Sequence, residues 1–131
     1  MSHGSVEIVR DMYAAFNRGE SPLASFTADF ELDTTDVTPD GSVVRGTEAA
    51  ESEMQAYWKN FDDFRVEMEE VIHADDERVV GVVRDRGRLP GSDAEISNLF
   101  FNVFTFRDGR IARLSFHTDR SRALAAAGLL E

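Results

Sequence analysis

Apolar residues recur at helical spacing near the start of the chain. In residues 5–17, Val6, Val9, Tyr13 and Phe16 fall on one face of a helical projection. Such a broad apolar stripe beside polar positions is typical of an amphipathic helix that packs on a core. The pattern therefore predicts a helix over residues 5–17.

Capping residues and helical spacing predict three further helices. Ser21 followed by proline favours a short helix over residues 22–26, because serine caps helices well and proline fits the first helical position. A longer helix is predicted over residues 47–60. A last one, over residues 120–127, would have Asp119 as its N-cap.

Most of the remaining chain alternates apolar and polar residues, as strands do. Adjacent apolar residues near the end of the first long strand predict a bulge at residues 69–70. Turn sequences at residues 90–93 and at Asp108–Gly109 predict hairpins. The predicted strands span residues 30–34, 42–44, 64–72, 79–89, 95–106 and 111–117.

Helices that precede hairpin-linked strands predict an α+β fold with an antiparallel sheet. The strand at residues 95–106 is apolar on both faces, so both faces need cover. We expect one face to meet the helices around an apolar pocket. That face carries Ile96, Asn98, Phe100, Asn102, Phe104 and Phe106.

The opposite face of the same strand carries Leu99, Phe101 and Val103. A monomer would expose this apolar strip to water, so we expect a second copy of the chain to cover it. The predicted partners are thus a small apolar ligand and a second copy, in a homodimer.

The 131 residues fit one domain, 1–131, and the formal charge of −11 argues against nucleic-acid binding. No apolar run approaches the roughly 20 residues of a membrane helix. Residues 1–4 are polar and expected to be disordered, and the start of the chain has no signal-peptide core. With no cysteine in the chain, a cytoplasmic location is the default expectation.

Four segments, in their order and spacing, carry a family resemblance. They are MYAAFNRGE at 12–20, FTADF at 26–30, VRGTEA at 44–49 and FTFRDGRIAR at 104–113. With them the chain resembles the SnoaL-like members of the nuclear transport factor 2-like superfamily, which includes ketosteroid isomerases and polyketide cyclases. The resemblance implies a cone-shaped curved antiparallel sheet, three helices in the N-terminal half that enclose a pocket, and a short C-terminal helix. Because this fold hosts many activities, function must be argued from the site.

The likeness to ketosteroid isomerases implies an oxyanion hole. Their tyrosine and aspartic acid fall on Tyr13 and Asn102, and an asparagine amide can also donate to an oxyanion. The base position falls on Thr34, which cannot take a proton at neutral pH. Alternatively, Tyr13 is an amphipathic core residue and Asn102 a satisfied buried amide.

The likeness to SnoaL-like cyclases implies an acid/base aspartate at Asp119, with His117 two residues earlier. A His–Asp pair can move a proton near pH 7. The alternatives are an N-cap role for Asp119 and a surface position for His117.

Pocket contacts are expected from Trp58, Asn98, Phe100 and Phe104. No histidine spacing resembles a zinc motif, so neither a metal nor a cofactor is predicted. Residues 84–88 alternate arginine with other residues, which indicates a charged outer face or a clamp for a carboxylate ligand.

Three functions remain open from the sequence. The first is a cofactor-free isomerase, cyclase or dehydratase that transfers a proton on an apolar carbonyl compound. The second is a non-catalytic pocket for an apolar ligand, and the third is a dimeric association domain filled by its own phenylalanines. A titratable group in the pocket with a shifted pKa would favour the enzyme.

Overall fold

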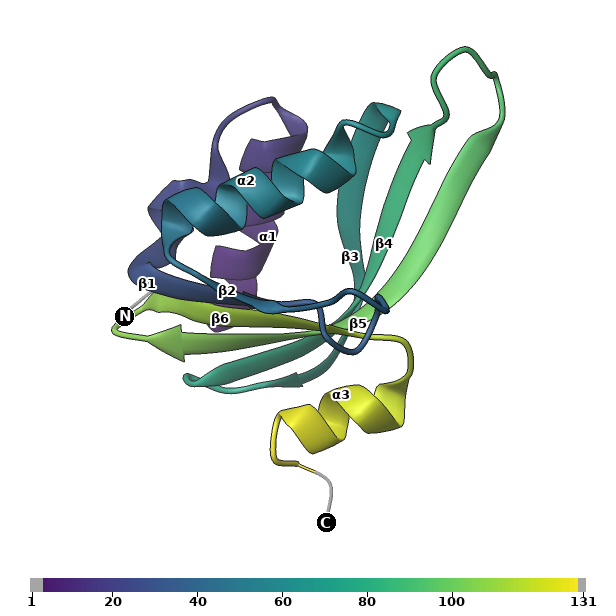
Figure 1. Ribbon diagram of the computed structural model, residues 1–131. Helices are drawn as coiled ribbons and strands as arrows, with labels where there is room; N and C mark the ends of the chain where they lie inside the picture. The colour runs from purple at the N-terminus through teal and green to yellow at the C-terminus, as the bar shows by residue number, and fades with distance from the viewer. Residues whose placement is uncertain (1–3, 130–131) are drawn as a thin grey trace.

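The computed structural model describes residues 4–129 of the chain, in which three helices and a short 3₁₀-helix pack on a six-stranded curved sheet (Figure 1). Disorder was expected for residues 1–4, of which 1–3 lie outside the described residues. Gly4 is described and precedes the first helix. No helix in the described part is long and apolar enough to cross a membrane. The helical elements are α1 (Ser5–Asn17), η1 (Pro22–Ser25), α2 (Thr47–Trp58) and α3 (Arg120–Ala126).

The strands lie in the order β2-β1-β6-β5-β4-β3. All neighbours are antiparallel except β1 and β6, which run parallel and make the sheet mixed. Side-chain alternation shows that a segment is a strand but not which distant strand it pairs with, so this parallel pair was not predicted. The strands are β1 (Phe26–Asp33), β2 (Val43–Arg45), β3 (Asp62–Ala74), β4 (Arg78–Arg88), β5 (Glu95–Arg107) and β6 (Arg110–His117).

Local sequence signals account for several boundaries. The Ser21 hydroxyl accepts a hydrogen bond from the Leu23 amide and caps η1, as predicted. The β3–β4 register shifts between Met68 and Glu70, which confirms the bulge. At the β5–β6 turn, Asp108 and Gly109 both have positive φ, the geometry that an Asp-Gly hairpin favours.

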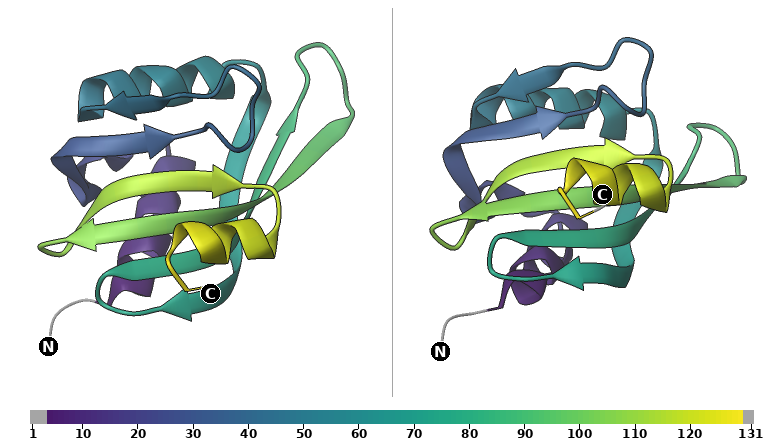
Figure 2. Two further views of the ribbon diagram at one scale, coloured as in Figure 1. Left: turned by 60° about the horizontal axis from the view of Figure 1, so that its bottom comes forward. Right: turned by 90° about the horizontal axis from the view of Figure 1, so that it is seen from below.

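The main core lies between α1 and the concave face of the sheet and includes Val9, Phe30, Phe104 and Ile111, all fully buried. In the views of Figure 2, α3 lies on the other side of the sheet, across β5 and β6. The two sides of β5 are therefore covered by different helices of the same chain.

The helix α3 covers much of the strip that was expected to form a dimer interface. Val103 is buried with Val80 and Ala123, and Phe101 packs against them. Leu99 remains 39% exposed. The homodimer thus stays a prediction, with a smaller apolar surface to support it.

Candidate functional site

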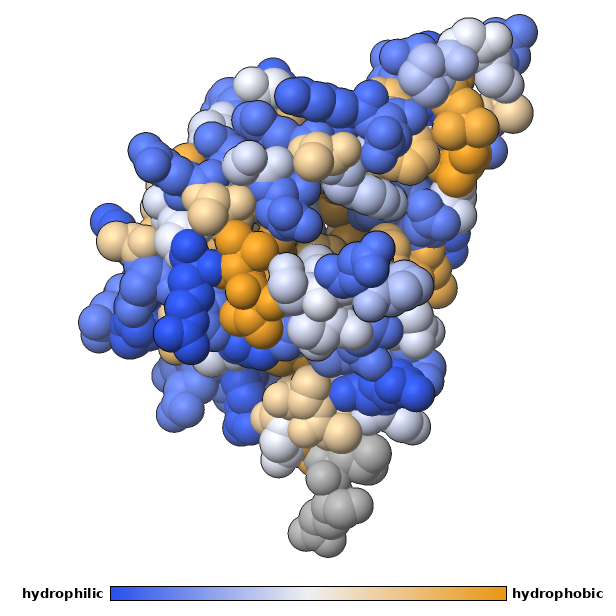
Figure 3. All heavy atoms as spheres, viewed as in Figure 1, coloured by the Kyte–Doolittle hydropathy of each residue, from blue (hydrophilic) through white to orange (hydrophobic). Residues whose placement is uncertain are grey.

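A cavity of about 680 Å³ lies between the concave face of the sheet and the helices α1 and α2. Most of its wall is aromatic or aliphatic, with rings from α1, α2 and β5. In the space-filling view, the surface below α2 is hollowed, and apolar atoms are visible inside the hollow (Figure 3). A concave apolar pocket with a few polar groups is the usual form of a small-molecule site.

Asp85 is the one acidic residue deep in this wall. It sits in the middle of β4 and is 7% exposed. Burial raises the pKa of its carboxyl group to about 7, while the Tyr57 hydroxyl has the smaller, opposite effect. The carboxyl group can therefore gain or lose a proton near neutral pH.

From the sequence, residues 84–88 were expected to form a charged outer face or a carboxylate clamp, and Asp85 was not among the expected site residues. The arginines do face outward, where Arg84 bonds Glu69 at 2.8 Å and Arg86 lies 3.5 Å from the same carboxylate. Alternation along β4 then turns Asp85 to the inner face, with Val83. This alternation was the signal that could have identified Asp85.

Tyr57 and Asn98 lie beside Asp85 in the cavity wall. Asn98 is the cross-strand partner of Asp85 in the β4–β5 ladder, and its Nδ2 donates to the Tyr57 hydroxyl at 3.3 Å. Burial, followed by the negative charge of Asp85, raises the pKa of Tyr57 to about 12. These two side chains can hold a ligand oxygen close to the carboxyl group.

A second polar cluster lies further along β5. Asn102 is fully buried and lines the cavity, and neither its Nδ2 nor its Oδ1 has a hydrogen-bond partner among the described residues. Its cross-strand partners, Gly81 on β4 and Phe116 on β6, offer no side chain that could bond the amide. An unpaired amide in a cavity wall is suited to bind a ligand or water, since leaving it unsatisfied is costly.

Tyr13, on α1, lines the same cavity. Its ring packs edge-on against Phe104, with 6.1 Å between the ring centroids. Burial and the charge of Asp85 raise the pKa of the Tyr13 hydroxyl above its usual value, while the Asn102 amide has the opposite effect. The phenol is therefore neutral at physiological pH and can donate a hydrogen bond.

The predicted ligand contacts divide into two groups. Trp58, Asn98 and Phe100 line the cavity. Phe104 does not: it is fully buried in the main core, where α1 covers it. Thr34, at the base position of the isomerases, also lines the cavity.

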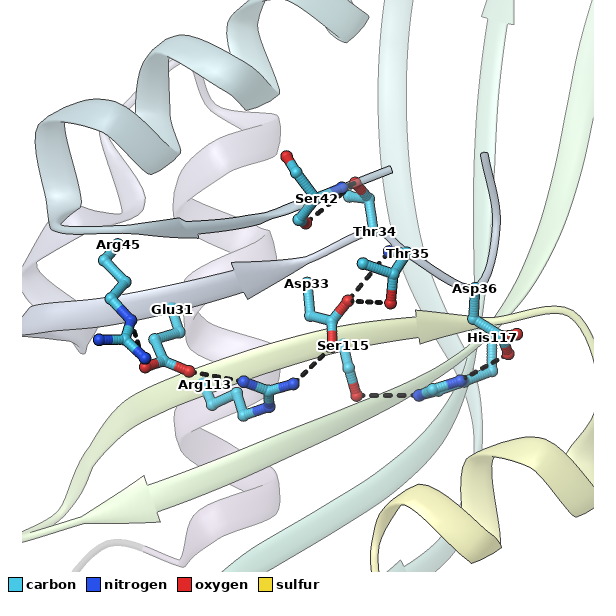
Figure 4. A network of polar contacts seen from close by, with 10 residues as sticks. All are labelled: Glu31, Asp33, Thr34, Thr35, Asp36, Ser42, Arg45, Arg113, Ser115 and His117. Carbon is cyan, nitrogen blue, oxygen red and sulfur yellow. Dashed lines mark hydrogen bonds and ion pairs between the residues drawn. The ribbon is translucent and has the colours of Figure 1, made fainter. Parts of the chain in front are cut away.

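His117 and Asp119 do not line the cavity and do not form the predicted pair. On β6, alternation turns Ser115 and His117 away from it, and His117 bonds Ser115 at 2.9 Å through Nε2 and Asp36 at 2.8 Å through Nδ1 (Figure 4). Asp119 accepts the backbone N–H of Arg122 and caps α3. The geometry thus favours the capping role for Asp119 and gives His117 partners outside the site.

No metal site is evident in residues 4–129, where no group of three or more histidine or acidic side chains could hold an ion. The cavity wall offers instead one buried carboxyl group and several uncharged donors, among them the tyrosine–asparagine pairs Tyr57 with Asn98 and Tyr13 with Asn102. This set can move one proton and hold one oxygen.

Comparison with known proteins places the chain in a family. The sequence profile of the SnoaL-like domain matches residues 9–114. An NTF2-like protein of unknown function from Burkholderia pseudomallei shares the fold, with a TM-score of 0.73, 21% identity and coverage of 95% of this chain and 97% of that one. No protein of curated function is similar enough in sequence to match.

Two other solved structures are comparably similar. Bal32a, from a soil-derived mobile gene cassette, is 26% identical over 86% of each chain, with a TM-score of 0.72. TerC, co-crystallised with polyporic acid, is 20% identical over 95% of each chain, with a TM-score of 0.71. Because the domain profile spans most of the chain, the chain belongs to the SnoaL-like domain family and has the NTF2-like fold.

Proposed function

We propose that this protein is a cofactor-free enzyme that transfers a proton on an apolar carbonyl compound, with Asp85 as the base. The observation that carries the proposal is a carboxyl group, 7% exposed, in the wall of a mostly apolar cavity of about 680 Å³. A base with a pKa close to the working pH is the most effective kind.

The proposed step moves one proton. The substrate carbonyl oxygen accepts hydrogen bonds from Tyr13 and from Asn102 Nδ2. The Asp85 carboxylate takes a proton from a carbon that the carbonyl acidifies. The electron pair of the C–H bond forms a C=C bond, and the π pair of the carbonyl group moves to its oxygen. Asp85 then returns the proton to the same or a conjugated carbon.

Each group in this step suits its role. The two donors favour the enolate oxygen over the ketone oxygen, because hydrogen bonds to a developing negative charge are stronger. Asn102 needs no change of protonation to donate. The apolar wall supports binding of the substrate skeleton and strengthens these electrostatic effects.

Ligand binding alone is the second candidate, and the unpaired Asn102 amide favours it. In that case the protonated form of Asp85, which burial favours, donates a hydrogen bond to the ligand. A cavity of this volume does not support a third function, an association domain filled by its own phenylalanines. The bound polyporic acid of TerC supports ligand binding by proteins of this fold.

Hydrogen–deuterium exchange of two ketones separates the candidates. 2-Tetralone exchanges next to its carbonyl group, and isophorone also exchanges at conjugated positions. In deuterated buffer at pH 8, the protein should accelerate exchange well above the buffer rate, and Asp85→Asn should abolish the acceleration. Asp93→Asn, which removes a carboxylate from the exposed β4–β5 turn, is the matched control and should behave as wild type.

The outcome decides between the two functions. Acceleration that survives Asp85→Asn would contradict the role of Asp85. No acceleration, together with saturable binding of the same ketones, would favour the binding protein.

A further inference from the structure

The cavity wall has an unusual charge composition. The chain contains 14 lysine and arginine residues, all within the described part, and none of them lines the cavity. The described histidines are absent from the wall as well. Its charged members are all acidic: Asp40, Glu53 and Asp85.

The arginines near the site are held elsewhere by other carboxylates. Arg84 bonds Glu69 on the outer face of the sheet, and Arg122, on α3, bonds Asp36 at 2.7 Å. Asp85 is therefore buried without a cationic partner. An anionic ligand entering the cavity would meet only like charges there, and such contacts are unfavourable in a low-dielectric wall.

The acidic residues occupy two depths. Asp85 is buried, whereas Asp40 and Glu53 are exposed although they line the cavity, which puts them at its mouth. Asp40 comes from the segment between β1 and β2, and Glu53 comes from α2. The mouth thus carries negative charge from two separate elements.

Aromatic rings accompany these carboxylates. Tyr57 follows Glu53 by one helical turn, so the two side chains share a face of α2, and both line the cavity. A carboxylate beside an aromatic ring suits an organic ammonium group, which is attracted by both. Deeper inside, the same cavity wall contains the buried Asn102 amide, which has no hydrogen-bond partner among the described residues.

We propose that the cavity selects molecules that carry a protonated amine, held at the mouth by Asp40, Glu53 and the Tyr57 ring, and rejects carboxylates and phosphate esters. This inference names a substrate class for the function proposed above and rests on it. The substrate would be a basic amine with an apolar carbonyl-bearing part, which enters the cavity first and reaches Asp85.

Three probes of similar size but different charge test this preference by their binding affinities, without an activity assay. They are 2-(2-naphthyl)ethylammonium, 2-(2-naphthyl)ethanol and 2-naphthylacetate, titrated calorimetrically at pH 8 in low salt. The ammonium should bind at least about fivefold more tightly than the alcohol, because a carboxylate pair and a ring attract it at a partly exposed site. The carboxylate should bind more weakly than the alcohol, and added salt should narrow both differences.

Two double variants test whether the residues at the cavity mouth cause the preference for the ammonium group. The double variant Asp40→Asn/Glu53→Gln should bring the affinity of the ammonium close to that of the alcohol. Its control, Glu48→Gln/Asp93→Asn, removes the same charge from α2 and from a distant turn and should leave the preference intact.

Three results would overturn the proposal: equal binding of ammonium and carboxylate, a preference unchanged in the double variant, or no binding of any probe. The uncharged ketones of the exchange assay test the proposed function separately. If the protein preferred the ammonium probe but did not accelerate ketone exchange, the proposed enzymatic function would be wrong and the amine preference would still hold.

Discussion

His117 and Asp36 are 81 residues apart in the chain, yet His117 Nδ1 lies 2.8 Å from an oxygen of the Asp36 carboxylate. This contact ties β6 to the segment between β1 and β2, which supplies Val37, Thr38 and Asp40 to the cavity wall. The hydrogen bond from His117, together with the nearby Arg122, holds the pKa of Asp36 below its usual range. We therefore expect His117 to position this part of the cavity wall.

Replacing His117 with alanine should loosen this segment. His117 is 7% exposed and bonded at both ring nitrogens, so the variant should lose about 1–3 kcal/mol of unfolding free energy. Amide exchange should become faster in residues 34–42, as measured by mass spectrometry. His73→Ala is the control: it breaks a histidine–carboxylate pair of 2.7 Å near the β3–β4 turn and should leave residues 34–42 protected. Unchanged exchange there in His117→Ala would contradict the positioning role.

Replacing Asn102 with leucine should weaken ligand binding without lowering the stability of the protein. The variant removes a fully buried amide without a partner among the described residues, so the unfolding free energy should stay constant or rise, by up to about 3 kcal/mol. Affinity for 2-naphthol, a planar mimic of an enolate, should fall at least about tenfold, because one bond to the oxygen is lost.

Val103→Ala gives the opposite pattern and serves as its control. Val103 lies next to Asn102 on β5 but faces α3, so this variant should lose stability and keep its affinity for the phenol. If Asn102→Leu instead destabilised the protein and bound the phenol as wild type does, the amide would serve the fold.

Replacing Asp85 with asparagine should stabilise the protein in a pH-dependent way. The folded-state pKa of about 7 lies above the unfolded value, so the native protein holds a proton that the unfolded chain releases between about pH 4 and pH 7. Wild-type stability therefore falls relative to the variant across that window and levels off above it. The full pH-dependent difference in unfolding free energy between the variant and the wild type is at most about 4 kcal/mol.

Urea unfolding of both proteins at pH 4, 5.5, 7 and 8 measures this difference. The gap should be smallest at pH 4 and largest at pH 8. A gap independent of pH would mean that Asp85 ionises as it does in the unfolded chain.

A homodimer is still expected, through the part of β5 that α3 leaves open. Leu99 is 39% exposed there. Sedimentation velocity at tens of micromolar should show two chains, and Leu99→Asp should shift the protein to one chain by placing a charge in the apolar contact. A wild-type monomer would mean that α3 alone provides the cover.

The sequence predicted the order of the elements well, because periodicity, caps and turn residues act locally. It also predicted that Tyr13 and Asn102 line one cavity, since alternation and family resemblance agree on them. It could not reveal the partners of His117, because Asp36 reaches it only through the parallel pairing of β1 and β6.

Asp85 was missed for a different reason. Its neighbours Arg84 and Arg86 made the whole segment resemble a solvated face, although alternation assigns every second residue to the interior. Phe104 was expected to contact the ligand, but α1 covers that end of β5 and buries it in the core. Strand alternation shows that Phe104 faces the helices, but it does not show how far the cavity extends along the strand.

The titration of Asp85 tests the central claim most directly. With aspartate labelled by ¹³C at the side-chain carboxyl, the resonance that is missing in Asp85→Asn identifies this group, and its chemical shift can be followed from pH 3 to pH 9. We expect a midpoint near 7 in the free protein, because burial in the mostly apolar cavity disfavours the charged carboxylate. A midpoint near 4 would show a solvated carboxylate and contradict the account.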